Sequence, residues 1–432
     1  MPFFDRNTSS VHELPVRSRV IIVGAGIHGV GVAHDLSTRG WKDVLVIEKG
    51  SVGSATSGWS TKLIHGGLRY LKRISQFSMV SASLKERKVL MNVAPDLVKP
   101  IELVYPIVKE KGLSSFIVKI GLSLYDFLAG RKSLSPHRQL DLASVSKLLP
   151  DLNVDKFSGA FSFWDCQTDD QALTERVAWS AVKWGALVAE GITVRSVEKS
   201  KDGFVVTVND QKGETRKISS LYVINAAGPW ANRLLTTSGF TPYMEGMNVR
   251  GSHILCRDLG QKAGAFFESP SDGRIFFVLP WMGFTLIGTT EKLELGDPDL
   301  QKPSEEEIDY LLSKYNEYHD RKLSREDIEY TFSGLRWLAK ESKKGMTSTS
   351  REVHITSHDG ERGFLLTIYG GKLTSYRDLA IKIGDELTNH FGEYKESRTD
   401  DPQYWIQADD IVPRPPADVK KRFQRMPSHA QA

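Results

Sequence analysis

The sequence predicts an α/β protein in which a discontinuous, Rossmann-like nucleotide-binding domain is combined with a second, mainly antiparallel β-sheet domain. Three observations lead to this prediction. Residues 20–37 read as a buried strand, a glycine-rich turn and a helix. Residues 247–290 change to the apolar and polar alternation of antiparallel strands. The apolar runs within 221–230 and 363–374 end in glycine-rich turns, so we expect the first domain to return twice along the chain.

The first segments form one βαβ unit in this interpretation. Residues 20–23 are all apolar, which is typical of a parallel strand buried on both faces. A helical segment follows over 27–37, and a second apolar run, 44–47, ends at Glu48. Parallel strands joined by a helix almost always adopt a right-handed crossover, so these segments are expected to be neighbours in one sheet.

The remaining elements are expected from periodicity and from turn residues. Ser304 opens a helix with Glu307 three positions later, which is a capping box. Residues after 391 are polar and poor in core-forming periodicity, so we expect a tail there. Further helices are expected at 77–93, at 169–184 and from 370 to about 390, and strands at 192–197, 204–208, 352–357 and 363–369.

The composition excludes some classes of function. The 57 basic residues nearly balance the 53 acidic ones, and a net charge of +4 argues against nucleic-acid binding, which usually shows a clustered basic face. A mild positive charge suits anionic ligands. Cys166 and Cys256 lack CxxC spacing, and His354 and His358 have no companions at ligand spacing. We therefore expect neither a disulfide framework nor a metal site.

The glycine-rich turn at 24–29 has the pattern GxGxxG. Its first glycine permits the tight turn, the second lets a diphosphate approach the backbone, and the third lets the helix pack on the strand. Helix N-terminal amides then face the phosphates. Glu48 ends the next strand, where a carboxylate can accept hydrogen bonds from ribose hydroxyls. The turn predicts a dinucleotide, but it does not distinguish NAD from FAD.

Three further motifs favour FAD: SATS with TKLIHGGLRY over 54–70, NAAGPW at 225–230 and GGKLT at 370–374. A flavin dinucleotide needs small residues beside its diphosphate and a helix N-terminus near the isoalloxazine O2. The residues expected to contact FAD are Gly24, Gly26, Ile27, Gly29, Glu48, Lys49, Thr56, Ser57, Thr61, Lys62, Leu63, His65, Gly66, Gly67, Val194, Ala227, Gly228, Trp230, Gly371, Lys372, Leu373 and Thr374.

At these motifs the sequence resembles the FAD-dependent glycerol-3-phosphate dehydrogenases of the D-amino-acid-oxidase-like superfamily. The strings STKLIHGGLRYL, RGSHI, RIFFVLPW, LIGTT, SGLRWL and IYGGKLTSYR occur in family order. The resemblance implies oxidation of glycerol 3-phosphate to dihydroxyacetone phosphate, with electrons passed from the reduced flavin to a membrane quinone. The expected domains are an FAD-binding domain over 16–97, 156–245 and 351–391, a substrate domain over 98–155 and 246–350, and a polar C-terminal tail over 392–432.

A phosphorylated substrate requires convergent cations in its pocket. A single basic residue is more often a solvated surface charge. Two of the candidates are exceptions, because Arg336 has apolar neighbours and Lys372 follows two glycines, which favours burial near a ligand. The residues expected to bind substrate all lie in the family-like motifs and are Arg69, Tyr70, Arg336, Arg351 and Lys372.

His253 is the candidate base for the hydroxyl proton, by resemblance and because a strand end can direct it at the flavin. The alternative is a hydrogen-bonded core histidine. Arg336 is expected to polarise the developing carbonyl oxygen, and Lys372 completes the catalytic set. Trp337 is larger than expected next to Arg336, which leaves another small phosphorylated alcohol as an alternative substrate. An oxidase that uses oxygen, an amino-acid oxidase and a non-catalytic flavin-binding scaffold also remain open.

The segment 107–133 combines an apolar face with Lys109, Lys111, Lys119, Arg131 and Lys132. Such a segment can lie on an anionic membrane surface, but an internal helix explains the pattern equally well. The N-terminus lacks the apolar stretch of a secretory signal. We therefore expect a cytoplasmic enzyme, with peripheral contact to the inner face of the membrane and a homodimer as further hypotheses.

Overall fold

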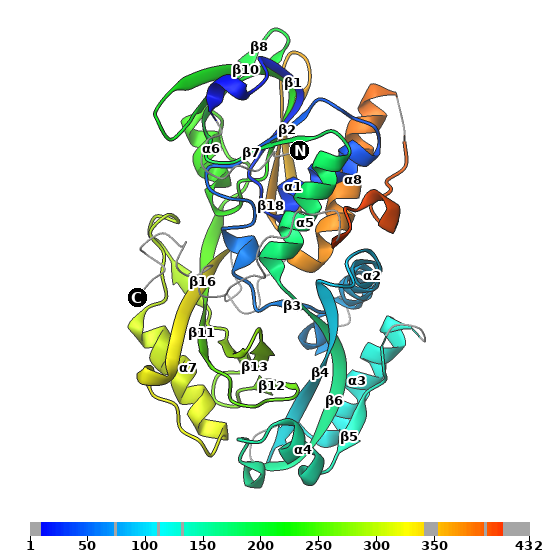
Figure 1. Ribbon diagram of the computed structural model, residues 1–432, viewed down its shortest axis with the longest axis vertical. Coiled ribbons are helices and arrows are strands. Elements are labelled where there is room, and N and C mark those ends of the chain that lie inside the picture. The colour runs from blue at the N-terminus through cyan, green and yellow to red at the C-terminus, as the bar shows by residue number, and fades with distance from the viewer. Residues whose placement is uncertain are drawn as a thin grey trace.

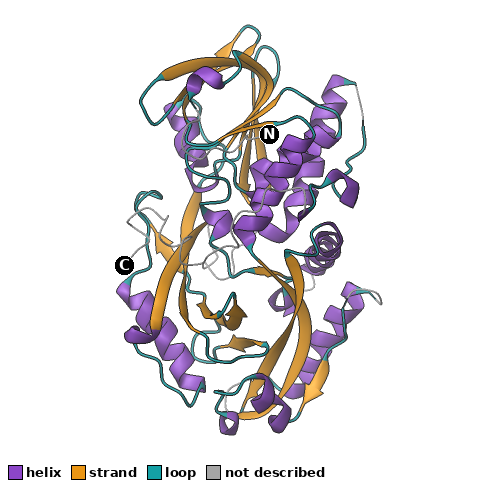
Figure 2. Cartoon of the chain, viewed as in Figure 1, coloured by secondary structure: helices purple, strands orange, loops and turns teal. Residues whose placement is uncertain are grey.

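The computed structural model describes residues 10–72, 76–109, 113–130, 134–340, 353–392 and 395–408. Two sheets organise these residues into two lobes, drawn one above the other in Figure 1. Figure 2 shows that helices cover the outer sides of both lobes. The predicted α/β class, with a Rossmann-like domain and a second β-rich domain, is confirmed.

The first sheet contains the strand predicted near the N-terminus. This strand, β1 (Arg17–Val23), pairs in parallel with β2 (Val44–Ile47) and β10 (Thr215–Asn225), and Ile22 lies between Val46 and Ile224. Strands from three separate stretches of the chain thus meet in one sheet. Parallel outer strands are β7 (Leu187–Ala189) and β18 (Phe364–Gly370), and antiparallel ones are β8 (Thr193–Ser200), β9 (Gly203–Asn209) and β17 (Val353–Asp359).

Helix α1 (Ile27–Thr38) packs on this sheet and lies between two other helices, α5 (Asp170–Lys183) and α8 (Tyr376–Phe391) (Figure 1). Most of its residues are buried, because it has neighbours on several sides. Burial of apolar surface contributes about 25 cal/mol per Å². This packing fixes the N-terminal end of α1, and the turn before it, against the sheet.

The second sheet is mainly antiparallel, as expected. Its longest pairings join β11 (Gly246–Arg257) to β16 (Ile328–Ala339), and β4 (Val98–Val108) to β6 (Phe157–Thr168). Because β6 belongs to this sheet, the change of sheet comes after Thr168 and not at the expected boundary 155/156. The other strands are β3 (Leu63–Ile64), β5 (Arg138–Leu140), β12 (Gly264–Glu268), β13 (Ile275–Trp281), β14 (Phe284–Gly288) and β15 (Lys292–Glu294).

Helices of the second lobe pack on the outside of this sheet (Figure 1). Helix α7 (Glu305–Tyr318) is capped by Ser304 in the predicted capping box, in which the Glu307 carboxylate accepts from the Ser304 amide at 3.0 Å. Its Leu311 and Tyr315 enter the apolar core of the lobe. The remaining helices are α2 (Phe77–Val93), α3 (Ser115–Ala129), α4 (Leu142–Leu148) and, in the first lobe, α6 (Ala231–Thr237).

Helix α3 carries an exposed apolar face. It buries Val118, Leu122 and Tyr125, whereas Phe116 and Phe127 are 73% and 79% exposed. Of the basic residues expected to flank this face, Lys111, Arg131 and Lys132 lie outside the described residues. In the described part of the chain, no helix is sufficiently long and apolar to cross a bilayer.

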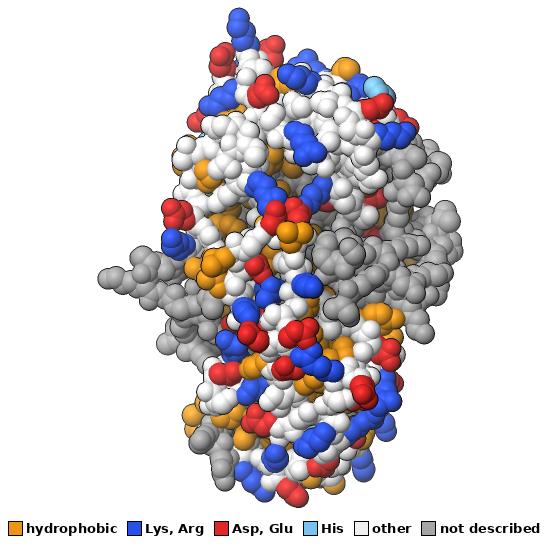
Figure 3. Space-filling view, turned by 90° about the vertical axis from the view of Figure 1, so that its left-hand side faces the viewer, with side chains coloured by type: hydrophobic (Ala, Val, Ile, Leu, Met, Phe, Trp, Pro, Cys, Tyr) orange, Lys and Arg blue, Asp and Glu red, His pale blue; other side chains and the backbone are white. Residues whose placement is uncertain are grey.

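Basic and acidic side chains are intermixed over the described part of the face shown in Figure 3. This distribution agrees with the near balance of 57 basic and 53 acidic residues. Mixed charges of this kind disfavour self-association, and they exert only a weak long-range electrostatic attraction on charged ligands.

The expected C-terminal tail is wrong for residues 395–408, which pack against the first lobe. Trp405 is fully buried, its Nε1 donates to the Thr399 carbonyl at 2.9 Å, and its ring meets His34 edge-on with centroids 5.2 Å apart. The Tyr404 carbonyl lies 2.9 Å from His34 Nε2. This segment therefore holds α1 from the side opposite to the sheet.

Replacing Trp405 by alanine is expected to lower the free energy of unfolding by about 3–5 kcal/mol, the usual cost of removing a large buried aromatic side chain. Urea denaturation followed by circular dichroism measures this loss. Gln403→Ala is the matched control, because Gln403 lies in the same segment and is exposed. Its effect is expected within about 0.5 kcal/mol. Equal stability of the two variants would contradict the assigned packing.

Candidate functional site

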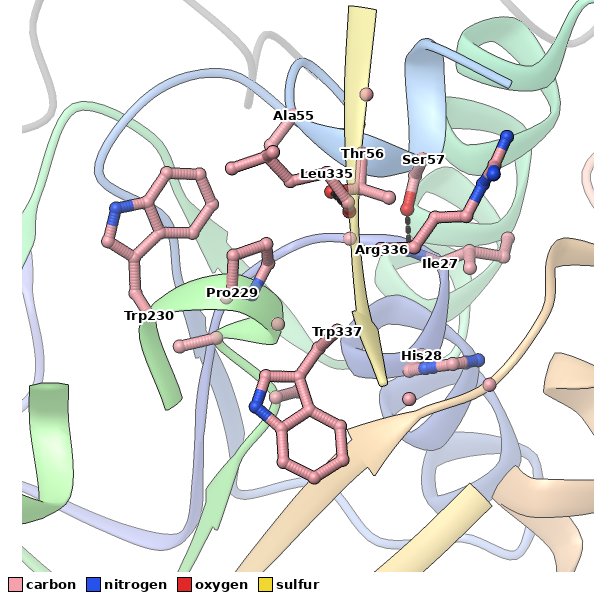
Figure 4. Close-up of a pocket in the computed structure, with 18 of the residues that line it drawn as sticks. Ile27, His28, Ala55, Thr56, Ser57, Pro229, Trp230, Leu335, Arg336 and Trp337 are labelled. Atoms are coloured by element: carbon pink, nitrogen blue, oxygen red, sulfur yellow. Dashed lines mark hydrogen bonds between the residues drawn. The ribbon is translucent and has the colours of Figure 1, made fainter. Parts of the chain in front are cut away.

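A cavity of about 510 Å³ lies where the two lobes meet, within the usual size range of cofactor sites. Its wall begins at the glycine-rich turn after β1 and includes the end of β2, the loop 55–65 and the turns after β10 and β18. Strand β16 of the second lobe contributes residues 334–338 (Figure 4). The predicted nucleotide-binding motifs thus surround one space.

The glycine-rich turn needs its glycines for steric reasons. Gly24 has φ +102°, and a Cβ there would lie 2.7 Å from the Ala226 carbonyl oxygen. A Cβ on Gly29 would lie 1.9 Å from the Gly24 carbonyl oxygen, so the third glycine permits the helix to contact the strand. Gly24 and Gly26 line the cavity, whereas Gly29 lies behind them. This arrangement leaves the backbone open to a diphosphate.

The carboxylate of Glu48 closes the turn from the side of β2. Its Oε2 accepts from the Ala25 amide and its Oε1 from the Gly50 amide, both at 2.8 Å. Desolvation of the carboxylate raises the pKa of Glu48, while these amides oppose the shift. Glu48 lines the cavity, at the position where a ribose hydroxyl is expected beside the diphosphate.

The loop before β3 connects the turn to the second lobe. Ser57 Oγ accepts from the Ile27 amide at 2.9 Å, at the start of α1 (Figure 4). Thr56 Oγ1 donates to the Leu335 carbonyl of β16 at 2.7 Å. These two bonds place small polar side chains along the middle of the cavity, which fits the narrow diphosphate of a flavin dinucleotide.

Every residue expected to contact FAD lines the cavity except Gly29, Lys62, Gly66 and Gly67. Lys62 does not line the cavity because its ammonium is buried elsewhere. It donates to Asp170 at 2.7 Å and to the Gly58 carbonyl at 2.6 Å. The Gly66 amide donates to the Tyr125 hydroxyl at 2.8 Å. Lys62 and Gly66 thus hold the loop that carries Thr61 and His65, which do line the cavity.

The cations expected to bind phosphate partly converge. Arg336 and Lys372 line the same cavity, and so does Tyr70. The ammonium of Lys372 lies 4.3 Å from the centroid of the Tyr70 ring. Arg336 donates to Thr289 Oγ1 at 3.3 Å and lies 3.6 Å from a Glu291 oxygen. Arg351 lies outside the described residues, as does the side chain of Arg69.

His253 lies one layer behind the cavity wall. It is 1% exposed, its ring stacks on Phe332 at 4.7 Å, and its Nε2 is 3.0 Å from Thr61 Oγ1. Burial, followed by the nearby charges of Arg336 and Lys62, holds the pKa of His253 well below its ordinary value. The imidazole is therefore neutral, and Thr61 is its link to the cavity.

The sequence analysis did not assign His28 and Trp337 to the cavity wall. His28 lies in the GxGxxG turn itself, and burial lowers its pKa to about 4. The ring of Trp337 packs against that of Tyr369 in a tilted arrangement with centroids 4.7 Å apart, and Figure 4 shows Trp337 leaving β16 in a different direction from Arg336. The bulk of Trp337 therefore faces the first sheet, not the guanidinium of Arg336.

Comparison with known proteins agrees with this geometry. The chain is 36% identical over 380 residues to the D-erythritol 1-phosphate dehydrogenase of Brucella abortus, covering 87% of this chain and 75% of the relative. It is 34% identical over 376 residues to the aerobic glycerol-3-phosphate dehydrogenase of Escherichia coli, covering 86% of this chain and 74% of that one.

A solved structure and a family model point the same way. The glycerol-3-phosphate dehydrogenase of Bacillus halodurans, solved with FAD, superimposes with a TM-score of 0.71 and 25% identity, covering 89% of this chain and 67% of that chain. Residues 19–377 match the family model described as FAD dependent oxidoreductase. The chain therefore belongs to the FAD-dependent oxidoreductase family.

Proposed function

We propose that this chain oxidises sn-glycerol 3-phosphate to dihydroxyacetone phosphate with FAD as its cofactor. The observation that carries the proposal is that Arg336 and Lys372, from different lobes, line the cavity that begins at the glycine-rich turn. A phosphorylated alcohol needs a cation for its phosphate and a donor for the oxygen that becomes a carbonyl, and Lys372 and Arg336 can supply one each. The Escherichia coli relative, whose name specifies this substrate, supports the choice.

Each polar group has a defined task in this proposal. Lys372 and Tyr70 bind the phosphate, and Arg336 orients the hydroxyl that becomes a carbonyl. When bound, FAD supplies the acceptor for the hydride, atom N5 of its isoalloxazine ring. The neutral imidazole of His253 accepts the hydroxyl proton through Thr61, because a ring nitrogen without a proton is available at neutral pH.

The visible spectrum of the purified protein under nitrogen tests this function. Glycerol 3-phosphate is expected to bleach the flavin absorbance, whereas glycerol is not, since it offers the cations no charge. Glycine and sarcosine serve as further controls, because bleaching by either one alone would identify an amino-acid oxidase. A spectrum unchanged by glycerol 3-phosphate would overturn the proposal.

A second candidate substrate is a four-carbon polyol phosphate. The Brucella abortus relative, 36% identical, is named for D-erythritol 1-phosphate. The cations Arg336 and Lys372 suit either phosphate equally. The ratio of kcat/KM for the two substrates decides which one is preferred.

The electron acceptor is proposed to be a membrane quinone. After anaerobic bleaching, a soluble quinone analogue is expected to restore the flavin absorbance faster than air does. Rapid reoxidation by air with formation of hydrogen peroxide would instead identify an oxidase.

We also propose that α3 contacts the membrane surface. Ile120 and Phe127 follow Phe116 at spacings that place all three on one face of the helix, and Lys119 lies nearby in the sequence. Liposomes with anionic lipids are expected to sediment the protein at low salt and less so at high salt. The double variant Phe116→Ser/Phe127→Ser is expected to remain in the supernatant.

The matched control is Leu295→Ser, because Leu295 is 88% exposed on the second lobe outside α3. It is expected to sediment like the wild type. A wild-type protein that stays in the supernatant at low salt would remove membrane contact from the proposal. The homodimer stays a prediction.

A further inference from the structure

A smaller cavity of about 80 Å³ extends from the main one beyond Arg336. Thr61, Leu63, His65 and Arg336 line both spaces, so the two cavities adjoin at these side chains. We call the smaller space the side cavity. Its other walls come from β4, β6, β12 and β13 of the second lobe, from residues 67–68 and from the residues that follow β14.

The size of the side cavity suits a small polar group. A water molecule occupies about 30 Å³ of the liquid, so 80 Å³ accommodates more than one water-sized group. A hydroxymethyl group fits in this space. The side cavity can therefore take the end of a carbon chain whose reacting carbon lies in the main cavity.

The polar groups of the side cavity suit hydroxyls. Glu291, whose side chain is 10% exposed, supplies carboxylate oxygens that accept, and it lies 3.6 Å from Arg336, which donates. Thr289 adds a hydroxyl that bonds to Arg336 at 3.3 Å. A polyol hydroxyl both donates and accepts, so an adjacent carboxylate and guanidinium satisfy it fully.

The same groups disfavour an anion. The negative charge of Glu291 lies next to the space, and the second arginine in its wall, Arg274, directs its guanidinium toward the ring of Tyr310 at 5.6 Å. Asp165 is also in the wall, bound to Arg87 and Tyr125. The phosphate therefore belongs with Lys372 and Tyr70, at the other side of Arg336.

We infer that the side cavity is a subsite for the terminal hydroxymethyl group of a phosphorylated polyol longer than glycerol 3-phosphate, and that Glu291 determines this specificity. The inference rests on the proposed function and deepens it. Its consequence is that the enzyme oxidises the four-carbon polyol phosphate as well as glycerol 3-phosphate.

Substitutions of Ile275 test the inference, because Ile275 lines the side cavity but not the main one. Ile275→Phe is expected to lower kcat/KM for D-erythritol 1-phosphate about ten- to hundred-fold by filling the space, with less than about three-fold change for glycerol 3-phosphate. Ile275→Ala, which enlarges the space, is expected to keep both activities. Ile275→Leu is the volume-matched control.

Substitution of Glu291 supplies a second measurement. Glu291→Gln is expected to raise KM for the four-carbon substrate more than for glycerol 3-phosphate, because the amide keeps the size but loses a strong acceptor. Flavin content and melting temperature are measured for every variant and are expected to stay unchanged, since Ile275 and Glu291 do not line the main cavity.

The outcomes separate the inference from the function. If glycerol 3-phosphate bleaches the flavin but the four-carbon substrate does not, the subsite is overturned and the proposed function stands. The same holds if the ratio of the two kcat/KM values is equal in all Ile275 variants. If neither compound bleaches the flavin, both fail. Should Ile275→Phe not fold, the ratios for Glu291→Gln and the wild type decide.

Discussion

Replacing Gly29 by alanine is expected to yield a colourless protein that has lost its flavin. The added Cβ would lie 1.9 Å from the Gly24 carbonyl oxygen, and this neighbour is backbone that no rotamer change can move. Helix α1 must then shift away from β1, and the turn that carries Gly24 and Gly26 shifts with it. Because each 1.4 kcal/mol of lost binding energy is tenfold in affinity, we expect FAD to bind at least about a hundred-fold more weakly.

The measurement is FAD titration of the apoprotein, followed by flavin fluorescence, together with thermal melting. The overpacked contact is also expected to cost about 1–3 kcal/mol of stability. Gly121→Ala is the matched control, because Gly121 lies within helix α3 and its added Cβ would meet nothing within 4 Å beyond its chain neighbours and the backbone of its own helix. That control is expected to bind FAD normally and to be slightly more stable, since alanine favours helix. Full FAD occupancy in Gly29→Ala would contradict the assigned role.

The sequence predicted the local elements well, because their signals are local. Strand β2 (44–47) and helix α2 (77–93) have the predicted bounds, and the capping box at Ser304 is present. Each depends on apolar periodicity or on a cap within a few residues. The glycine-rich turn belongs to the same class, since its steric requirement acts between Gly24 and Gly29.

Long-range pairing was less accessible to the sequence. Strand β6 was not predicted, and its pairing with β4 is known only from the folded chain. Trp405 is similar, because its burial depends on His34, far away in the sequence, and nothing in the polar segment around it indicates a core position. Lys62 was expected to contact the cofactor, whereas its charge is taken up by Asp170.

The candidate site shows the same contrast between what local sequence signals predict and what only the folded chain reveals. Arg336 and Lys372 line the cavity, and the sequence motifs predicted a position near the ligand for both, because their apolar or glycine neighbours favour burial. The depth of His253 behind Thr61 could not be predicted, since strand alternation gives the face of a residue but not what covers it. The different directions of Arg336 and Trp337 follow from the alternation of side chains along β16.

Replacing Arg336 by alanine is expected to lower kcat/KM for glycerol 3-phosphate by about 10²–10³, the usual effect of removing one donor that acts on developing charge in a closed site. The flavin is expected to remain bound, because the diphosphate wall of Gly24, Gly26 and Ser57 is untouched. Loss of the guanidinium also leaves Glu291 without this nearby cation, so the pocket becomes less favourable for an anionic substrate.

Arg336→Lys separates charge from geometry. Lysine restores the positive charge but lacks the planar set of donors that reaches Thr289 and the substrate together. If substrate binding depends mainly on charge, Arg336→Lys recovers KM, because the ground state needs only electrostatic attraction. The value of kcat then remains low, because the transition state needs the directed donor. Steady-state kinetics with a quinone analogue, alongside the visible spectrum of each variant, measure this split. Wild-type kinetics in Arg336→Ala would remove Arg336 from the site, and the substrate assignment would then depend on Lys372 alone.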